Sequence, residues 1–468
     1  MRFSNSILKW PLFQLPKQLR RYLWLTVVMA PAALASSATT SEHNAALTFL
    51  WIAVILIAAK VSGLVEKWGQ PAVLGELVIG VILGNLTLLG LNLFEPIKTD
   101  PAITFLAELG VVILLFQIGL ESNLREMKKV GLNAFLVAVL GVIVPFVLGT
   151  YIVGPWIMPD LTNNAYLFIG AALTATSVGI TARVFQDLKK LQTPEAKIVL
   201  GAAVIDDVLG LIILAIVSAI VTVGGVGLGV IGWITAKAVL FLVLAIILGQ
   251  LFAPYFGKIM AKIHSGSGTK ITMALSFGFT FAYLAQYIGL APIVGAFAAG
   301  LVLDAVHFRH FKDANLVNDI RQITHTAPVA TKEAVAVTLD KHAHRHVEDL
   351  IEPIGFLLIP IFFVVTGMSV DLSTLFDLNV LLIALIISAV AVVGKLVAGL
   401  VAGQANKWIV GFGMVPRGEV GLIFAMIGKS LGVINDEIFS IIVIMVILTT
   451  LATPPILSAL LKKNSATA

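Results

Sequence analysis

The stretch GAAVIDDVLGLIILAIV, from Gly201 to Val217, places two adjacent aspartates, Asp206 and Asp207, inside an otherwise apolar run. A carboxylate near the centre of a membrane helix costs about 2.5–3.5 kcal/mol on insertion scales, so acids in such segments are rare and usually functional. Similar apolar runs of roughly 17–25 residues recur along the chain, and each is long enough to cross the hydrocarbon core of a bilayer. The sequence therefore predicts a polytopic helical membrane protein with an acidic site inside the membrane.

The composition agrees with this fold class. Hydrophobic residues make up 59% of the 468 residues and charged residues 12%, with a mean hydropathy of +1.01, whereas soluble domains carry about 25% charged residues. The runs lack the period-two alternation of membrane barrel strands. Without cysteine, disulfides and zinc–thiolate sites are excluded, and no motif implies a cofactor. The net charge of +5 lies in loops and does not indicate a nucleic-acid partner.

We expect an all-α membrane protein with about thirteen transmembrane helices. The spans are predicted at 46–64, 71–90, 101–120, 130–153, 165–186, 196–222, 228–250, 268–288, 290–308, 351–369, 377–401, 407–431 and 436–461. Residues 1–35 combine a basic start, a short apolar stretch and small residues at Ala33 and Ala35, as in a cleaved signal peptide. A retained extra helix is the alternative.

Basic residues orient the spans. They gather in alternate loops and at the C-terminus, at Arg125, Lys128, Lys129, Lys189, Lys190, Lys197, Lys258, Lys262, Lys270, Lys462 and Lys463 and within 309–350. By the positive-inside rule these loops and the C-terminus are cytoplasmic, and the N-terminus is outside or lumenal. The loop 309–350 is also His-rich, with HAHRH at 342–346; it could sense pH, hold a metal, or be a simple solvated loop.

Two segments of the chain resemble two later ones. PAVLGELVIGVIL in span 2 matches PIVGAFAAGLVL in span 9, and FQIGLESNL in span 3 matches VVTGMSVDL in span 10. The matching glycines are Gly75, Gly80 and Gly119 in the first half and Gly295, Gly300 and Gly367 in the second. An offset of seven spans reverses direction in the membrane, so spans 2–6 and 9–13 are predicted to form inverted repeats, an arrangement typical of secondary transporters.

The repeat pairs span 5 with span 12, and both contain residues that interrupt helices. Span 5 holds LTATSVGIT, with the hydroxyls of Thr174, Thr176 and Ser177, and span 12 holds GFGMVPRGEVG, with Pro416 between glycines. Broken helices at corresponding positions of two halves are the best sequence indication of an ion site. We expect the two breaks to cross in the core, although the hydroxyls could serve ordinary helix packing instead.

The motifs AAVIDDVLGLI, TATSVGITARVF, FFVVTGM, VVGKLVAG and GMVPRGEVGLI carry a family resemblance. Over about residues 46–461 the chain resembles the monovalent cation:proton antiporter-2 family, whose bacterial, including cyanobacterial, sodium/proton exchangers pair two aspartates with a span-11 lysine. The resemblance implies Na+ or K+ exchange for protons in a bacterial plasma membrane or a thylakoid membrane, and a homodimer. The implied parts are a dimerisation domain (46–120 and 268–369), a transport core (130–222 and 377–461) and a linker helix (228–250).

The resemblance assigns Asp207 as the residue that binds Na+ and the proton in turn, and Asp206 as the partner of Lys395. The chemistry is suitable, because an ionised carboxylate binds a cation whereas a protonated one is neutral. Adjacent helix residues point about 100° apart, so the two aspartates cannot both face one ion. A lysine in the middle of a span needs an anion. That ion pair could be static, or it could break and re-form in each cycle.

Other polar residues have weaker interpretations. Arg417 and Glu419 could pair, or could offset the partial charges of the broken helix ends. We favour a scaffold or gate, because an arginine beside a cation site would repel the cation. Three acids and amides could line a funnel to the site or pair with neighbours or headgroups: Glu76, Glu108 and Gln117.

The motifs do not determine which cation is exchanged, so a K+/proton antiporter is the alternative to a Na+/proton antiporter. A cation channel could also place acids in a pore, but channels usually build rings of charge by symmetry. Intramembrane proteases place their aspartates on separate helices. We therefore expect an antiporter rather than an enzyme, with electrogenic exchange if the two aspartates and Lys395 all change protonation.

Overall fold

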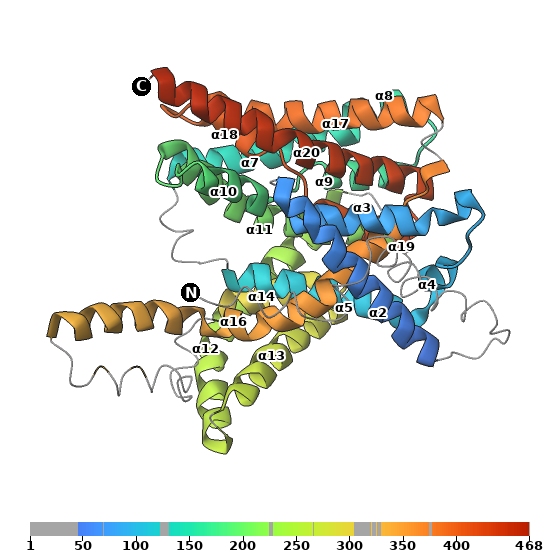
Figure 1. The fold of residues 1–468 in the computed structure, drawn as a ribbon. Helices are drawn as coiled ribbons and strands as arrows, with labels where there is room; N and C mark the ends of the chain where they lie inside the picture. Colours follow the sequence, from blue (N-terminus) through green and yellow to red (C-terminus); the bar gives the residue numbers. More distant parts are fainter. Residues whose placement is uncertain are drawn as a thin grey trace, which may run out of the picture.

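The structure, a computed structural model, describes residues 45–68, 70–121, 131–223, 228–264, 266–303, 320, 324, 329–373 and 377–467. All regular secondary structure within these ranges is helical (Figure 1). Eight of the described helices are long and apolar enough to cross a membrane, which confirms the polytopic helical fold. Each of the thirteen predicted spans coincides with a helix or with a pair of helices, while thirteen membrane crossings remain a prediction. The predicted signal peptide lies outside the described residues.

One group of helices packs around α5 and α16, with α5 against α14 and α16 against α3. Its members are α2 (Ala45–Ser62), α3 (Ala72–Gly84), α5 (Pro101–Glu121), α13 (Ser267–Tyr287), α14 (Pro292–Val302) and α16 (Val329–Met368). Short segments η3 (Gly63–Trp68), η4 (Leu86–Leu89) and α4 (Glu95–Thr99) connect the first three.

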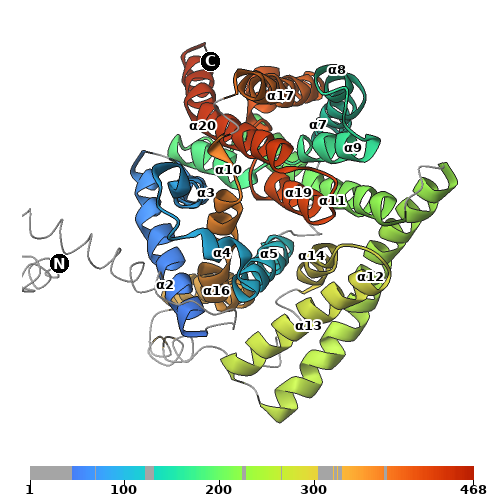
Figure 2. The same ribbon diagram turned by 90° about the vertical axis from the view of Figure 1, so that its right-hand side faces the viewer.

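A second group packs around α11 and α17, both of which contact α7. Its members are α7 (Leu132–Val147), α9 (Asn163–Ala172), α10 (Val178–Asp187), α11 (Pro194–Val223), α17 (Leu378–Ala398), α18 (Lys407–Gly413), α19 (Glu419–Ser430) and α20 (Asp436–Thr467). Shorter segments here are the π-helical η5 (Leu148–Val153), α8 (Gly154–Ile157) and η9 (Gly399–Val401). In Figure 2, α7, α8 and α17 lie at the top and α13, α14 and α16 lie below.

The helix α12 (Leu228–Ile263) contacts α11 of the second group and α14 of the first. It therefore connects the two groups, as the predicted linker helix would. Its length corrects one predicted boundary, because the helix continues past residue 250 through Lys258 and Lys262, which the charge pattern places in a loop. The apolar run continues to Ile263, so the two lysines occupy the last turns of the helix.

The segment 309–350 is a second correction. It was predicted as a loop, but residues 329–350 form the first half of α16. Sequence hydropathy missed this part because it is polar and reads as solvated chain. Residues 329–350 contain no Gly or Pro, so no helix-breaking residue separates them from the apolar run that follows.

Close glycine contacts join the helices of the predicted repeats. A Cβ on Gly80 would lie 3.0 Å from the Cα of Gly367, and a Cβ on Gly119 would lie 3.0 Å from the Cα of Gly300. A Cβ at either glycine would also lie closer still to a carbonyl oxygen of the facing helix, that of Val364 for Gly80 and that of Phe297 for Gly119, so each pair of helices meets through its glycines. The inverted repeat equates Gly80 with Gly300 and Gly367 with Gly119. The two contacts are thus the same contact made twice, which supports the predicted repeat.

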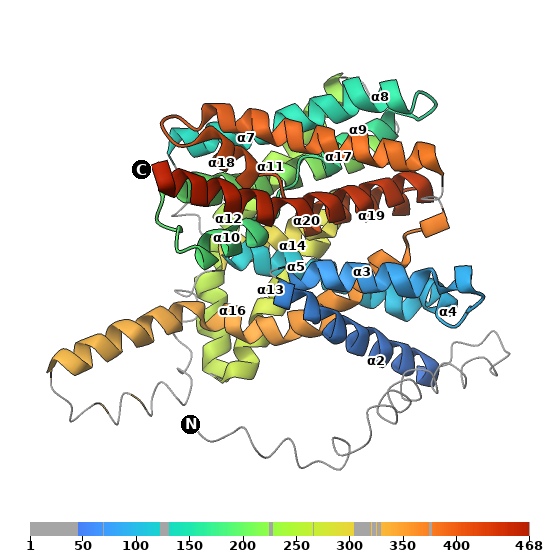
Figure 3. The same cartoon turned by 45° about the horizontal axis from the view of Figure 1, so that its top comes forward.

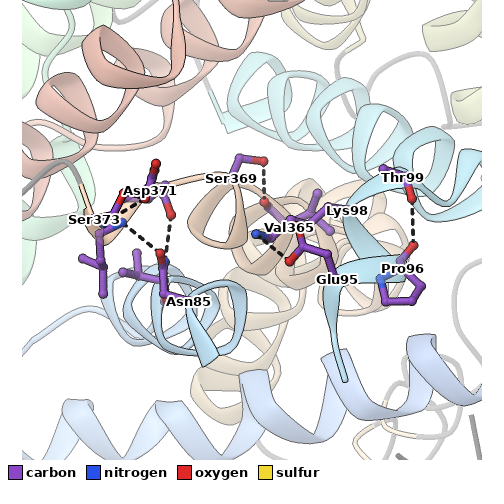
Figure 4. Close-up of polar contacts among 12 residues, drawn as sticks. Asn85, Glu95, Pro96, Lys98, Thr99, Val365, Ser369, Asp371 and Ser373 are labelled. Atoms are coloured by element: carbon purple, nitrogen blue, oxygen red, sulfur yellow. Dashed lines mark hydrogen bonds and ion pairs between the residues drawn. The ribbon is translucent and has the colours of Figure 1, made fainter. Parts of the chain in front are cut away.

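A polar network joins helix ends on one side of the molecule. Asn85, at the C-terminal end of α3, donates to the carbonyl of Val370 at 2.7 Å and accepts from the amide of Leu372 at 2.8 Å. Figure 4 shows its side chain pointing toward the segment that carries Asp371 and Ser373. The amide of Asp371 donates to Ser440 on α20 at 3.1 Å. The network therefore ties α3 and the end of α16 to α20.

Candidate ion-binding site

The two interrupted helices cross at their breaks. Residues 173–177 separate α9 from α10, and residues 414–418 separate α18 from α19. A break leaves the carbonyls of the first half and the amides of the second half without helical partners. Here the two breaks partly satisfy each other, because the amide of Ser177 donates to the carbonyl of Pro416 at 2.7 Å. The predicted pair of crossing broken helices is confirmed.

Hydroxyl groups add further bonds across the crossing. Thr176 Oγ1 donates to the carbonyl of Met414 at 3.2 Å, and Thr181 Oγ1 donates to the carbonyl of Gly413 at 2.6 Å. These bonds occupy the carbonyls at the end of α18. The crossing is therefore a hydrogen-bonded junction, in which groups of residues 176–181 donate to the carbonyls of residues 413–416.

Arg417 fills the centre of this junction and is fully buried. Its Nη1 donates to the carbonyls of Thr174 at 3.2 Å and Ala175 at 2.6 Å, and its Nη2 donates to the carbonyl of Ala391 on α17 at 2.8 Å. The positive guanidinium thus meets the partial negative charge at the end of α9. Its own carbonyl accepts from Thr450 Oγ1 at 2.6 Å. These contacts are those of a residue that holds the junction together.

Asp206 on α11 and Lys395 on α17 form an ion pair in the interior. Lys395 Nζ lies 2.8 Å from Asp206 Oδ1, and the side chains are 0% and 1% exposed. Gly141 on α7 leaves room for the lysine, since a Cβ there would lie 3.3 Å from Nζ. The second carboxylate oxygen, Asp206 Oδ2, is buried and has no hydrogen-bond partner among the described residues. The ion pair that the family resemblance implies is present in the structure.

Asp207 follows on the same helix but faces a different environment. It is half-buried, whereas Asp206 is buried. Both carboxylates act electrostatically on Lys395, so the second aspartate lies within the field of the ion pair. This difference is the one expected from the 100° turn between adjacent residues. Asp207 is therefore the more accessible of the two carboxylates, and Asp206 the enclosed one.

The three predicted hydroxyl groups are not equivalent. Thr174 Oγ1 donates to the carbonyl of Ala171 at 2.7 Å, a bond back to its own helix. Thr176 bonds across the junction as described, and Ser177 Oγ donates to Glu419 Oε2 at 3.3 Å. Only Ser177 lines the cavity described next. The sequence placed all three at the break correctly but could not separate packing hydroxyls from an accessible one.

A cavity of about 840 Å³ leads to the junction. Its walls come from α19 and α20 on one side and from α3, α5 and α16 on the other, two sets of helices that face each other in Figure 3. Ser177, Arg417, Glu419 and Thr450 line the side of the junction. The opposite wall holds Glu76 and Gln117, and the mouth is lined by Lys60, Glu66, Lys67, Asp349 and Glu352.

Two of the three residues predicted to line a funnel to the site do line this cavity. Glu76 and Gln117 line it, as expected, but Glu108 is exposed on α5 and does not. Thr450 was not singled out from the sequence. The signal that could have identified it is the pair of threonines in the apolar run of α20, since hydroxyls there can bond to broken backbone.

The sequence of the chain is similar to those of known proteins. A family profile described as "Sodium/hydrogen exchanger, transmembrane" matches residues 52–325 and 333–463. The chain is 34% identical over 448 residues to the high-affinity Na+/H+ antiporter NhaS3 of Synechocystis sp., covering 88% of this chain and 89% of that one. It is 33% identical over 417 residues to the Na+/H+-K+ antiporter GerN of Bacillus cereus, covering 87% and 95%.

The fold also resembles a solved structure. That of the sodium proton antiporter MjNhaP1 from Methanocaldococcus jannaschii at pH 8 covers 87% of this chain and 97% of its own, with a TM-score of 0.56. The sequence identity is 15%, so this likeness concerns the fold alone.

Proposed function

The chain belongs to the sodium/hydrogen exchanger family, and we propose that it is a secondary antiporter that exchanges Na+ for protons across a membrane. Relatives named as Na+/H+ antiporters, from Synechocystis and Enterococcus hirae, are 34% and 31% identical to it. The observation that carries the proposal is the buried Asp206–Lys395 pair beside Asp207, next to two crossing interrupted helices.

Asp207 is the shared carrier in this proposal. When its carboxylate is ionised it binds Na+, and when the cation leaves it binds a proton and becomes neutral. A cation and a proton cannot occupy the same oxygen, so the two are exchanged rather than carried together. Lys395 carries a positive charge beside the site, and Asp206, 2.8 Å away, offsets it. The bond made and broken in each cycle is the O–H bond of the Asp207 carboxyl group, and the exchange as proposed involves no resident cofactor.

Alternating access is supported by the unequal ends of the molecule. At one end the cavity reaches the junction at Ser177 and Glu419. At the other end the Asn85 network and the hydrogen bond from Lys429 to the carbonyl of Ser369, at 3.4 Å, hold the helices together. This is the arrangement of a transporter open to one side. Breaking the network while the cavity closes would expose the site to the other side.

We further propose the assembly implied by the family resemblance. The helices within 46–120 and 268–369 would form the dimerisation domain of a homodimer, and those within 130–222 and 377–461 the transport core. The two packing groups and the bridging α12 support this division. With the C-terminus cytoplasmic, the cavity opens to the cytoplasm, since its mouth lies where α2 ends and α3 begins. The membrane would be the bacterial plasma membrane or a thylakoid membrane.

K+/proton exchange is the second candidate, because the relative GerN of Bacillus cereus is named as a Na+/H+-K+ antiporter. The test is flux in proteoliposomes containing the purified full chain and a pH-sensitive dye. Addition of Na+ should move protons in the opposite direction, Li+ should do so to some extent, and K+ should not. A response to K+ alone would replace Na+ as the substrate, and no proton movement with any of the three would reject antiport.

A further inference from the structure

Glu76 is a buried acid that the exchange described above does not use. It lies on α3, is 8% exposed, and lines the cavity. Among the contacts of the described residues, its carboxyl group has no hydrogen bond and no ion pair. A buried carboxylate without a partner is unfavourable unless water or an ion reaches it. The cavity provides that access, so the side chain is placed to meet whatever enters.

The neighbouring charges do not neutralise Glu76 by direct contact. Lys60 and Glu66 act on it electrostatically with opposite signs. The ammonium group of Lys60 lies 5.5 Å from the centre of the Phe356 ring, so it has a cation–π contact of its own. Glu66 is exposed at the mouth of the cavity. Glu76 therefore remains an acceptor for a mobile cation deeper in the cavity.

The opposite wall carries a second carboxylate. Glu419 is the first residue of α19, and its carboxylate accepts a 3.3 Å hydrogen bond from the Ser177 hydroxyl. The guanidinium of Arg417, which also lines this wall, donates to three carbonyls. The walls of the cavity thus carry an acid on α3 and an acid on the interrupted helix.

The repeat shows that packing does not require an acid at this position. Aligning Gly75 with Gly295 places Ala296 at the position equivalent to Glu76, and Ala296 is fully buried. Aligning Gly119 with Gly367 places Val365 opposite Gln117 in the same way. The same helix contacts are therefore built from apolar residues in the other half. The polar pair is specific to the half that faces the cavity.

We propose that Glu76 is a transient binding residue for the transported monovalent cation on its way between the cytoplasm and Asp207. The proposal rests on the antiport function proposed above. A charged group in a cleft with apolar walls raises the local concentration of its counter-ion, because the walls focus its field. Glu76 lowers the Na+ concentration needed on the cavity side and leaves the exchange step at Asp207 unchanged.

The test compares Na+ dependence from the two faces, using the full chain in everted and right-side-out membrane vesicles. Glu76→Gln should raise the KM for Na+ on the cavity side about tenfold, with the maximal rate within about twofold of wild type. The KM on the opposite face should not change. A merely structural role would lower the maximal rate or the thermal stability and would affect both faces.

Two controls distinguish binding from general attraction. Glu108→Gln removes an exposed acid outside the cavity and should leave KM unchanged on both faces. Glu66→Gln removes an acid at the mouth and should raise KM by no more than about twofold. If Glu66→Gln has as large an effect as Glu76→Gln, or if Glu76→Gln leaves KM unchanged, the proposal is wrong.

A second variant covers a failure of Glu76→Gln to fold. Glu76→Asp keeps the charge but withdraws it by one methylene, and it should raise KM about threefold on the cavity side only. A KM equal to wild type in that variant overturns the proposal. If wild-type vesicles exchange no Na+ for protons, antiport itself fails, and that result is separate from any effect of position 76.

Discussion

Lys395 on α17 donates a 2.8 Å hydrogen bond to Asp206 on α11, and both side chains are buried. Removing one partner of such a pair leaves an uncompensated charge in the interior, which typically costs about 3–5 kcal/mol. Lys395→Met should therefore lower the thermal unfolding temperature of the detergent-purified protein markedly. The double variant Asp206→Asn/Lys395→Met removes both charges and should recover most of the loss. Equal unfolding temperatures for wild type and Lys395→Met would show that the pair does not stabilise the fold.

Asp207→Asn should abolish exchange and leave the protein folded. The amide has nearly the same shape as the acid, but it can neither ionise to bind Na+ nor release a proton. The measurement is Na+-dependent proton movement in proteoliposomes, with thermal unfolding as the check on folding. Asp206→Asn is the matched control and should lower the rate or the stability by orphaning Lys395. Full exchange by Asp207→Asn would remove this residue from the carrier role.

The exchange should respond to membrane potential. If Asp207, Asp206 and Lys395 together release two protons for one Na+, each turnover moves one net charge, worth about 2.3 kcal/mol per 100 mV. An inside-negative potential would then drive Na+ out without a pH gradient. The measurement is the steady-state Na+ gradient in proteoliposomes with a potential imposed by valinomycin and K+. A gradient that ignores the potential means one-for-one exchange, with Asp206 serving packing alone.

The glycine contacts predict matched effects in the two repeats. Gly80→Val and Gly300→Val each insert a side chain where helix backbones touch, and overpacking of this kind costs about 1–3 kcal/mol or more. Both should lower the unfolding temperature by similar amounts. Gly232→Val is the control, because a Cβ at this exposed position on α12 has nothing within 4 Å. Loss of stability in only one repeat would mean that the two contacts are not equivalent.

Hydropathy and helix-breaking residues predicted most of this fold. The apolar runs located the helices, because length and composition alone determine which segments can span a bilayer. Pro416 and the hydroxyl-rich stretch at 174–177 located both interruptions, since each lacks or competes for helical hydrogen bonds. The first half of α16 was not predicted as a helix, because its residues are polar and hydropathy identifies only apolar helices.

The site was predicted only as far as its residue types. The Asp206–Lys395 pair followed from the need of a mid-membrane lysine for an anion, together with the family resemblance. The partners of Arg417 could not be predicted, because they are three backbone carbonyls from distant segments. Every residue has a backbone carbonyl, so the sequence does not show which ones accept a hydrogen bond. Thr174 bonds to its own helix whereas Ser177 lines the cavity. This difference depends on which helix face meets the cavity.

The inverted repeat, which equates Gly80 with Gly300 and Gly367 with Gly119, has a consequence for alternating access. Two inverted halves that exchange their conformations produce the same molecule upside down, with its opening at the other end. That opening would present Ala296 and Val365 where Glu76 and Gln117 now stand, so the two entrances differ in charge although their backbones match. Microscopic reversibility forbids this difference from altering the final ion gradient. It can change only how soon each direction of transport saturates, which makes the exchanger a device with unequal forward and reverse kinetics and a single equilibrium.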